Sequence, residues 1–213
     1  AGPGAEAHMV GDLAARRGAA VGLYPQTFVP LGDRSLFEGF DGTYGSLLYS
    51  VALPDLEVES LSPSSLGGGW PSGLLATDGA RVYWYEETNY RAELYCSDGS
   101  AVGTRLVHRF DKGPGPSAPP HALGLLGGVG LFTGFEAETG LELWRSDCTE
   151  EGTFRLEDLA PGPGSSSPRH YVLWGDELCF LADLDLGTGV FCTDGSPGGT
   201  KLVWGFGDVG GSY

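Results

Sequence analysis

The chain has 213 residues, 41% of them hydrophobic, which is enough for one domain with a substantial core or for two small domains. Its formal net charge of −16 argues against proteins that bind nucleic acids or anionic membrane surfaces, because both classes rely on basic patches. No apolar run reaches the roughly 18 residues of a membrane span, so we expect no membrane insertion.

The first residues of the chain are interpreted as a leader. Met9 is the only methionine, and it follows the small-residue stretch AGPGAEA and His8. We therefore set residues 1–8 aside and treat residues 9–213 as a single domain. No secretory signal is recognisable, which predicts either a mature secreted chain or a cytoplasmic one.

Short strands joined by tight turns are predicted along the rest of the chain. The 37 glycines and 14 prolines alternate with short runs of Leu, Val, Tyr, Phe and Trp, a pattern typical of such strands. A first unit covers residues 25–69 and begins with TFVPLGDRSLFEGF. A second unit covers residues 70–118, with strands predicted over 81–87 and 92–98.

The last two units, residues 119–167 and 168–207, are the most regular. Each contains four short runs of strand-forming residues with Gly or Asp in the turns, residues that tolerate a tight backbone. The strands predicted in these two units cover residues 121–126, 130–135, 141–146, 153–159, 171–174, 178–182, 189–193 and 200–206.

Four copies of a four-stranded unit, with a period of about 48 residues, indicate β-propeller blades, because one such unit cannot bury both of its faces. We predict an all-β fold, a β-propeller of four-stranded antiparallel blades, and favour four blades. Five-blade closure and a propeller completed by an oligomer are the alternatives. The segment MVGDL at 9–13 is similar to RLEDL at 155–159, so it is expected to complete the last blade or to remain from a lost fifth blade.

The third and fourth strands of the units carry a repeated motif. It reads ELYCSDGSAVGT at 93–104, ELWRSDCTEEGT at 142–153 and VFCTDGSPGGT at 190–200. The motif resembles the bacterial ELWxxDGTxxGT repeat, and the period and copy number resemble the four-bladed hemopexin-type architecture. The resemblance implies a propeller from a secreted or surface protein of bacteria. Cys148 departs from the pattern by replacing the turn glycine, and the first unit lacks the Asp-Gly pair.

The Asp-Gly-x-x-Gly-Thr part of this motif is interpreted as a turn device rather than a ligand site. Asp and Gly make the bend, and the Leu-Trp pair before them fills the space between blades. Strand direction places these turns at one end of every blade. The start of the first strand and the turn between the second and third strands lie at the opposite end, called the top face below.

Two histidines are candidate metal ligands at the top face. The first strands of successive units begin at positions that align as Gln26, Ser72, His121 and His170. Neutral imidazoles in adjacent blades, at the mouth of a central channel, suit a transition metal. The alternative is that both histidines are exposed in loops or hydrogen-bond the loop that joins the blades.

Acidic residues form a second column, in the turn between the second and third strands. The column consists of Asp41, Glu87, Glu136 and Asp183. Carboxylates suit Ca²⁺, although their spacing matches no EF-hand loop. A divalent metal ion, either a transition metal or calcium, is therefore the cofactor that the sequence suggests. Solvated charged turns are the alternative.

The four cysteines allow two disulfides or four buried thiols. The strand prediction places Cys179 opposite Cys192 in one hairpin, which leaves Cys96 to pair with Cys148. No C-x-x-C pair occurs, which argues against zinc and thioredoxin-like sites. Two disulfides predict a secreted or extracytoplasmic protein, at the cell surface or in the periplasm.

Known enzyme motifs are absent from the sequence, so whether it is an enzyme stays open. We expect a binding module that holds a small molecule, a glycan, a protein or a cation at the top face. Trp70 and Tyr90 are candidate stacking surfaces for a glycan, although loop aromatics more often pack. A metal-dependent enzyme using His121 and His170 is one alternative, and a purely protein-binding propeller, which should expose an apolar patch, is another. An oligomer is compatible with each.

Overall fold

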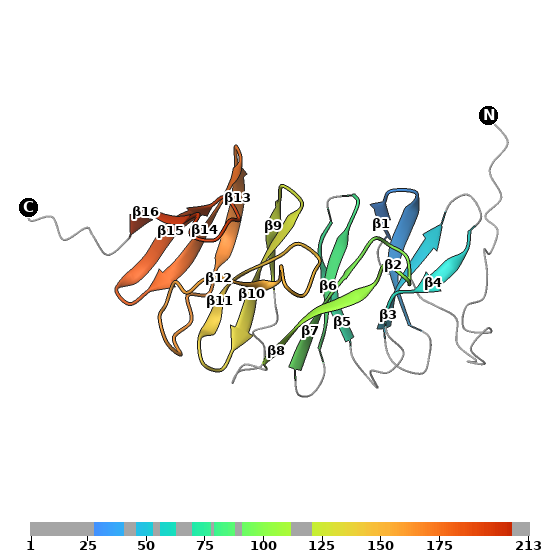
Figure 1. The fold of residues 1–213 in the computed structure, drawn as a ribbon, viewed down its shortest axis with the longest axis horizontal. Coiled ribbons are helices and arrows are strands. Elements are labelled where there is room, and N and C mark those ends of the chain that lie inside the picture. Colours follow the sequence, from blue (N-terminus) through green and yellow to red (C-terminus); the bar gives the residue numbers. More distant parts are fainter. Residues whose placement is uncertain are drawn as a thin grey trace, which may run out of the picture.

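The computed structural model describes residues 28–40, 46–52, 56–62, 70–77, 79–87, 91–111 and 121–205. These residues form sixteen strands in four antiparallel four-stranded sheets, which lie side by side in a row (Figure 1). The described part of the chain contains no helix that is long and apolar enough to cross a membrane. The predicted all-β fold of four-stranded blades is confirmed, with four blades.

The blades follow one another along the chain, and within each blade the strands pair in sequence order. The first blade contains β1 (Phe28–Leu31), β2 (Arg34–Phe40), β3 (Ser46–Ala52) and β4 (Val58–Ser60). The second contains β5 (Trp70–Thr77), β6 (Val82–Glu87), β7 (Arg91–Ser97) and β8 (Arg105–Asp111). The third contains β9 (Ala122–Leu126), β10 (Val129–Glu136), β11 (Gly140–Ser146) and β12 (Phe154–Glu157). The fourth contains β13 (Arg169–Trp174), β14 (Glu177–Leu184), β15 (Gly187–Thr193) and β16 (Thr200–Gly205).

Apolar clusters fill the spaces between consecutive blades. The second and third blades meet through Tyr83, Leu94, Phe110, Phe132 and Trp144, which are all buried. Similar clusters join the first blade to the second and the third blade to the fourth. Because burial of one such side chain stabilises the fold by roughly 1.5–3 kcal/mol, these interfaces hold the sheets together.

The row of blades does not close into a ring within the described residues. The first and fourth blades lie at opposite ends of the row (Figure 1), and the substantial contacts between blades join consecutive blades only. The segment at 9–13, predicted as a possible closing strand, lies outside the described residues. Each described blade therefore has one face toward the next blade and one face toward the previous blade, except at the two ends of the row.

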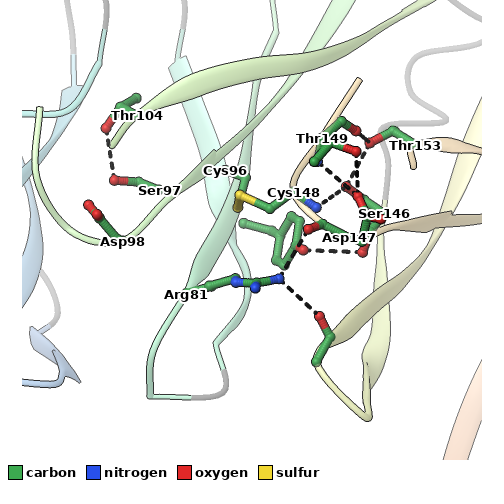
Figure 2. The surroundings of a disulfide bond; sticks show 12 residues. Arg81, Cys96, Ser97, Asp98, Thr104, Ser146, Asp147, Cys148, Thr149 and Thr153 are labelled. Atoms are coloured by element: carbon green, nitrogen blue, oxygen red, sulfur yellow. Dashed lines mark hydrogen bonds between the residues drawn. A yellow bond between two sulfur atoms is a disulfide. The ribbon is translucent and has the colours of Figure 1, made fainter. Parts of the chain in front are cut away.

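The repeated motif is a hydrogen-bonded turn, as predicted. In the third blade, the backbone N–H and the hydroxyl of Thr149 donate to Asp147 Oδ1 at 3.0 and 2.6 Å. The hydroxyls of Ser146 and Thr153 lie 2.7 Å apart, and the Cys148 N–H donates to Ser146 Oγ (Figure 2). Equivalent bonds surround the turn aspartates of the second and fourth blades, Asp98 and Asp194. The hydrogen bonds from Thr149 hold the pKa of Asp147 below its ordinary value.

Arginines connect each blade to the turn of the next. Their guanidinium groups donate to backbone carbonyls in that turn, at distances of 2.9–3.2 Å. The pairs are Arg34 with Gly99, Arg81 with Asp147, and Arg145 with Gly195. The motif turn is therefore also the point at which neighbouring blades are joined.

Both predicted disulfides are present, and they involve all four cysteines. Cys179 and Cys192 face each other across β14 and β15, within one hairpin. Cys96 of β7 reaches Cys148 in the turn of the third blade (Figure 2). Cys148 has a positive φ, 76°, at the position where the second and fourth blades have Gly99 and Gly195.

Candidate functional site

The structure places His121 and His170 at the start of the inner strands of adjacent blades. His121 precedes β9, and its N–H donates to Thr133 Oγ1 at 2.9 Å. His170 lies in β13 at an irregularity in the strand register, with a positive φ of 53°. Such bulges redirect side chains, and positive φ is uncommon outside glycine. Both histidines are exposed, which makes their rings accessible to solvent.

The two acidic turn residues whose side chains the structure describes already have partners. Glu136 Oε1 lies 3.4 Å from Nε2 of His108, which belongs to the second blade. Asp183 accepts hydrogen bonds from both terminal nitrogens of the Arg169 guanidinium, at 2.7 and 2.9 Å, and from the Thr188 hydroxyl. These bonds hold the pKa of Asp183 below its ordinary value. Both carboxylates therefore contribute to contacts within or between blades.

The remaining residues of the predicted site are not described at the level of side chains. Gln26, Asp41 and Tyr90 lie outside the described residues. The backbone places Trp70 and Ser72 in β5 and Glu87 at the end of β6. Their membership of a binding site stays a prediction.

The structure does not bring together a metal site among the residues it describes. No group of three or more His, Cys, Asp or Glu side chains in this part of the chain is close enough to hold an ion. The assignment of a metal to His121 and His170 therefore stays a prediction.

A buried carboxylate with a structural role was missed at the first position of the motif. Glu142 is fully buried, and it accepts hydrogen bonds from the Leu159 N–H and from the N–H and hydroxyl of Ser166. Burial raises the pKa of Glu142 above its ordinary value, against the effect of these bonds. In the second blade, Glu93 instead binds Arg109 and the Tyr95 hydroxyl. The sequence signal for a structural role was the recurrence of Glu at the first position of the motif, as Glu93 and Glu142.

The last blade exposes an apolar surface that no other described blade has. Leu178, Phe180 and Phe191 pack against the third blade, so alternation along the strands turns the intervening residues to the opposite side. We call that side the open face. It is formed by Val172, Trp174, Leu181, Val190 and Trp204 around the Cys179–Cys192 disulfide. Trp174 is 75% exposed and Val172 is 55% exposed.

Ion pairs lie at both ends of the open face. Lys201 Nζ lies 2.7 Å from Glu177 Oε1 beside Trp174. At the other end, Arg169 pairs with Asp183. The open face is thus an apolar centre between two neutralised charge pairs, an arrangement typical of protein interfaces.

An open depression of about 550 Å³ lies beside the last blade, between β13 and the third blade. Leu125, Leu173 and Arg145 line it, together with the turn residues Asp176 and Asp194. Leu173 and its neighbour Tyr171 are 56% and 51% exposed. The exposed apolar surface of the last blade therefore continues around β13, from the open face to the side that faces the third blade.

Comparisons with known proteins support the fold and assign no family. No protein-family model matches the sequence, and no curated protein matches it.

Solved structures share the architecture at low identity. An oligogalacturonate lyase in complex with manganese aligns with a TM-score of 0.51 and 12% identity, over 81% of this chain and 51% of its own. Dipeptidyl peptidase 4 of Porphyromonas gingivalis aligns with a TM-score of 0.50 and 12% identity, over 86% of this chain and 27% of its own. TolB from Acinetobacter baumannii has a TM-score of 0.47 and 14% identity, over 84% of this chain and 43% of its own. The chain thus spans about half or less of these proteins, and the likeness concerns the fold.

Proposed function

We propose that this chain is an extracytoplasmic protein-binding propeller module and that the open face of its last blade is the binding surface. The observation that carries the proposal is the exposure of Trp174 and Val172 at the centre of a face that is apolar and flanked by ion pairs. Contiguous exposed apolar surface on a folded protein marks interaction sites, and exposed tryptophan contributes strongly to binding.

The two disulfides support an extracytoplasmic location, because such bonds persist in oxidising compartments. The acidic composition fits the same proposal, because a net charge of −16 keeps the rest of the surface soluble and disfavours unspecific association. Top-face binding of a small ligand or a metal remains the expectation from sequence, with less support from the described side chains.

The test compares the wild-type chain with two variants. Trp174→Glu places a charge on the open face, whereas Val102→Glu makes the same change at a turn residue that is 98% exposed and remote in sequence from the last blade. Proteins retained by the immobilised wild-type chain from an extracytoplasmic extract are identified, purified and measured by interferometry.

We expect Trp174→Glu to weaken the binding of a purified partner by about 30-fold or more, as for an interface tryptophan, and Val102→Glu to leave it unchanged. Equal binding by the wild-type chain and Trp174→Glu would overturn the proposal. Circular dichroism confirms that both variants are folded.

A further inference from the structure

We propose that the open face binds the open face of a second copy of this chain, in a dimer with twofold symmetry. The inference rests on the proposed function and names its partner. Most soluble oligomers are symmetric dimers in which one surface patch binds the same patch of the other copy.

The open face has the geometry through which the blades already pack on each other. In the second blade, the residues at the corresponding strand positions are Tyr85 and Leu94, which are directly paired and buried against the third blade. In the fourth blade the corresponding pair is Leu181 and Val190, which is only half-buried. A four-stranded sheet with an apolar face is therefore the surface that this face is built to contact.

Charge favours an approach of two copies through this face over other faces. The pairs Glu177–Lys201 and Arg169–Asp183 leave the open face without net charge, while the whole chain carries −16. Two copies repel each other over most of their surface, and this repulsion is screened within about 10 Å at moderate ionic strength. The repulsion is smallest where each copy presents a neutral apolar face.

A head-to-tail assembly, with the last blade of one copy on the first blade of the next, has only a small receiving surface among the described residues. On the first blade, the face that points away from the second blade carries Phe37, Leu47 and Tyr49. These side chains are only 3–6% exposed, and Phe28 at the edge of the same face is the exposed apolar residue there, at 59%. The exposed apolar face of the last blade then finds its match in the same face of another copy.

The experiment is sedimentation velocity of the full chain over about 1–200 μM, a range that covers common dimer affinities. The wild-type chain is expected to pass from 22.3 kDa to twice that mass with increasing concentration. Trp174→Glu should weaken the dimer by about 30-fold or more. Val102→Glu should behave as wild type, because Val102 lies in the turn after β7.

A charge exchange tests the symmetry of the contact. Lys201→Glu places a second carboxylate beside Glu177 on each open face, so it should dissociate the dimer, and added salt should restore part of the affinity. The double variant Lys201→Glu/Glu177→Lys restores one charge of each sign and should dimerise again. Circular dichroism and urea unfolding of both variants at low concentration separate this result from a role of the ion pair in folding, because the exchange also rebuilds the pair within each chain.

Three outcomes overturn the inference: a wild-type chain that stays at 22.3 kDa throughout, a dimer that Trp174→Glu leaves intact, or a mass that grows beyond two copies. The proposed function fails separately. If the wild-type chain is a monomer and Trp174→Glu abolishes binding of a purified outside partner, the dimer is disproved and the proposed function stands. Retention of both the dimer and the outside partner by Trp174→Glu would remove both proposals.

Discussion

The second and fourth blades have the same strand order and differ in what covers the face toward the next blade. In the second blade, Cys96 stands two residues before the turn aspartate and forms a disulfide with Cys148 of the third blade. In the fourth blade, Cys192 stands at the same position and forms a disulfide with Cys179 of its own hairpin. One face is buried and the other is exposed.

This difference shows that one repeat position serves two purposes. Where a next blade is present, the position connects blades, through a disulfide at Cys96 or through the hydrogen bond of Arg145 to Gly195 in the third blade. In the fourth blade, which no described blade follows, the residue at this position forms a disulfide within its own sheet. The apolar residues around that disulfide are accessible to a partner.

Removing the disulfide between blades should have the largest effect. The variant Cys96→Ser/Cys148→Ser opens a loop with a sequence separation of 52, and Cys179→Ser/Cys192→Ser opens one of 13. The loop-entropy relation gives losses in the free energy of unfolding of about 4 and about 3 kcal/mol. Urea unfolding followed by tryptophan fluorescence measures both. A larger loss for the hairpin disulfide would contradict the comparison.

Truncating equivalent residues on the two faces should give unequal losses. Leu94→Ala removes a fully buried side chain between blades and should lower the free energy of unfolding by about 2–5 kcal/mol. Val190→Ala, at the half-buried equivalent, should cost about 1 kcal/mol or less. Guanidinium unfolding below the concentration of self-association checks this. Similar losses would mean that the open face is covered within a single chain.

The buried glutamate of the motif should matter in the third blade, where it binds the connection to the fourth. Glu142→Ala leaves the donors of Leu159 and Ser166 without their acceptor and should lower the free energy of unfolding by about 2–3 kcal/mol. Hydrogen exchange of those two amides should accelerate in the same variant. Unchanged protection would show that the connection is held by other contacts. The fourth blade has Gly189 at this position, with no carboxylate to lose.

The smallest expected effect is a pH dependence from the interface of the second and third blades. His108 packs on the rings of Phe110 and Trp144, each with centroids 4.6 Å away, and burial lowers its pKa below 6.5. The folded state then binds the proton less tightly than the unfolded state. The associated stability is present above pH 6.5 and is lost as the pH falls below that value.

The measurement is the free energy of unfolding between about pH 8 and pH 5.5, where roughly 1 kcal/mol should be lost. The nearby carboxylates of Glu136, Glu150 and Asp111 oppose this shift and limit its size. In His108→Gln the loss over this range should shrink. If the free energy of unfolding of the variant fell with pH as steeply as that of the wild-type chain, the pH dependence would belong to other groups.

Much of the fold was predictable because its determinants are local. The strands predicted over 141–146 and 189–193 match β11 and β15 to within two residues, since Gly and Asp mark the turns and apolar residues alternate between them. The pairing of Cys179 with Cys192 followed from the hairpin register. The candidate site was less predictable: the sequence placed His121 and His170 at the same end of adjacent blades, and could not show that Asp183 is occupied by Arg169.

The sequence by itself determined the four-stranded repeat and its turn device, favoured four blades and indicated how the cysteines would pair, because periodicity, turn residues and cysteine positions act within one or two repeats. The tertiary structure shows that both cysteine pairs are disulfides. Only the tertiary structure decided which blade faces are covered. Trp174 and Val172 belong to the same alternating pattern as buried residues of other blades, and exposure depends on whether another sheet lies against them. No other described sheet lies against the open face, which is the face proposed for binding.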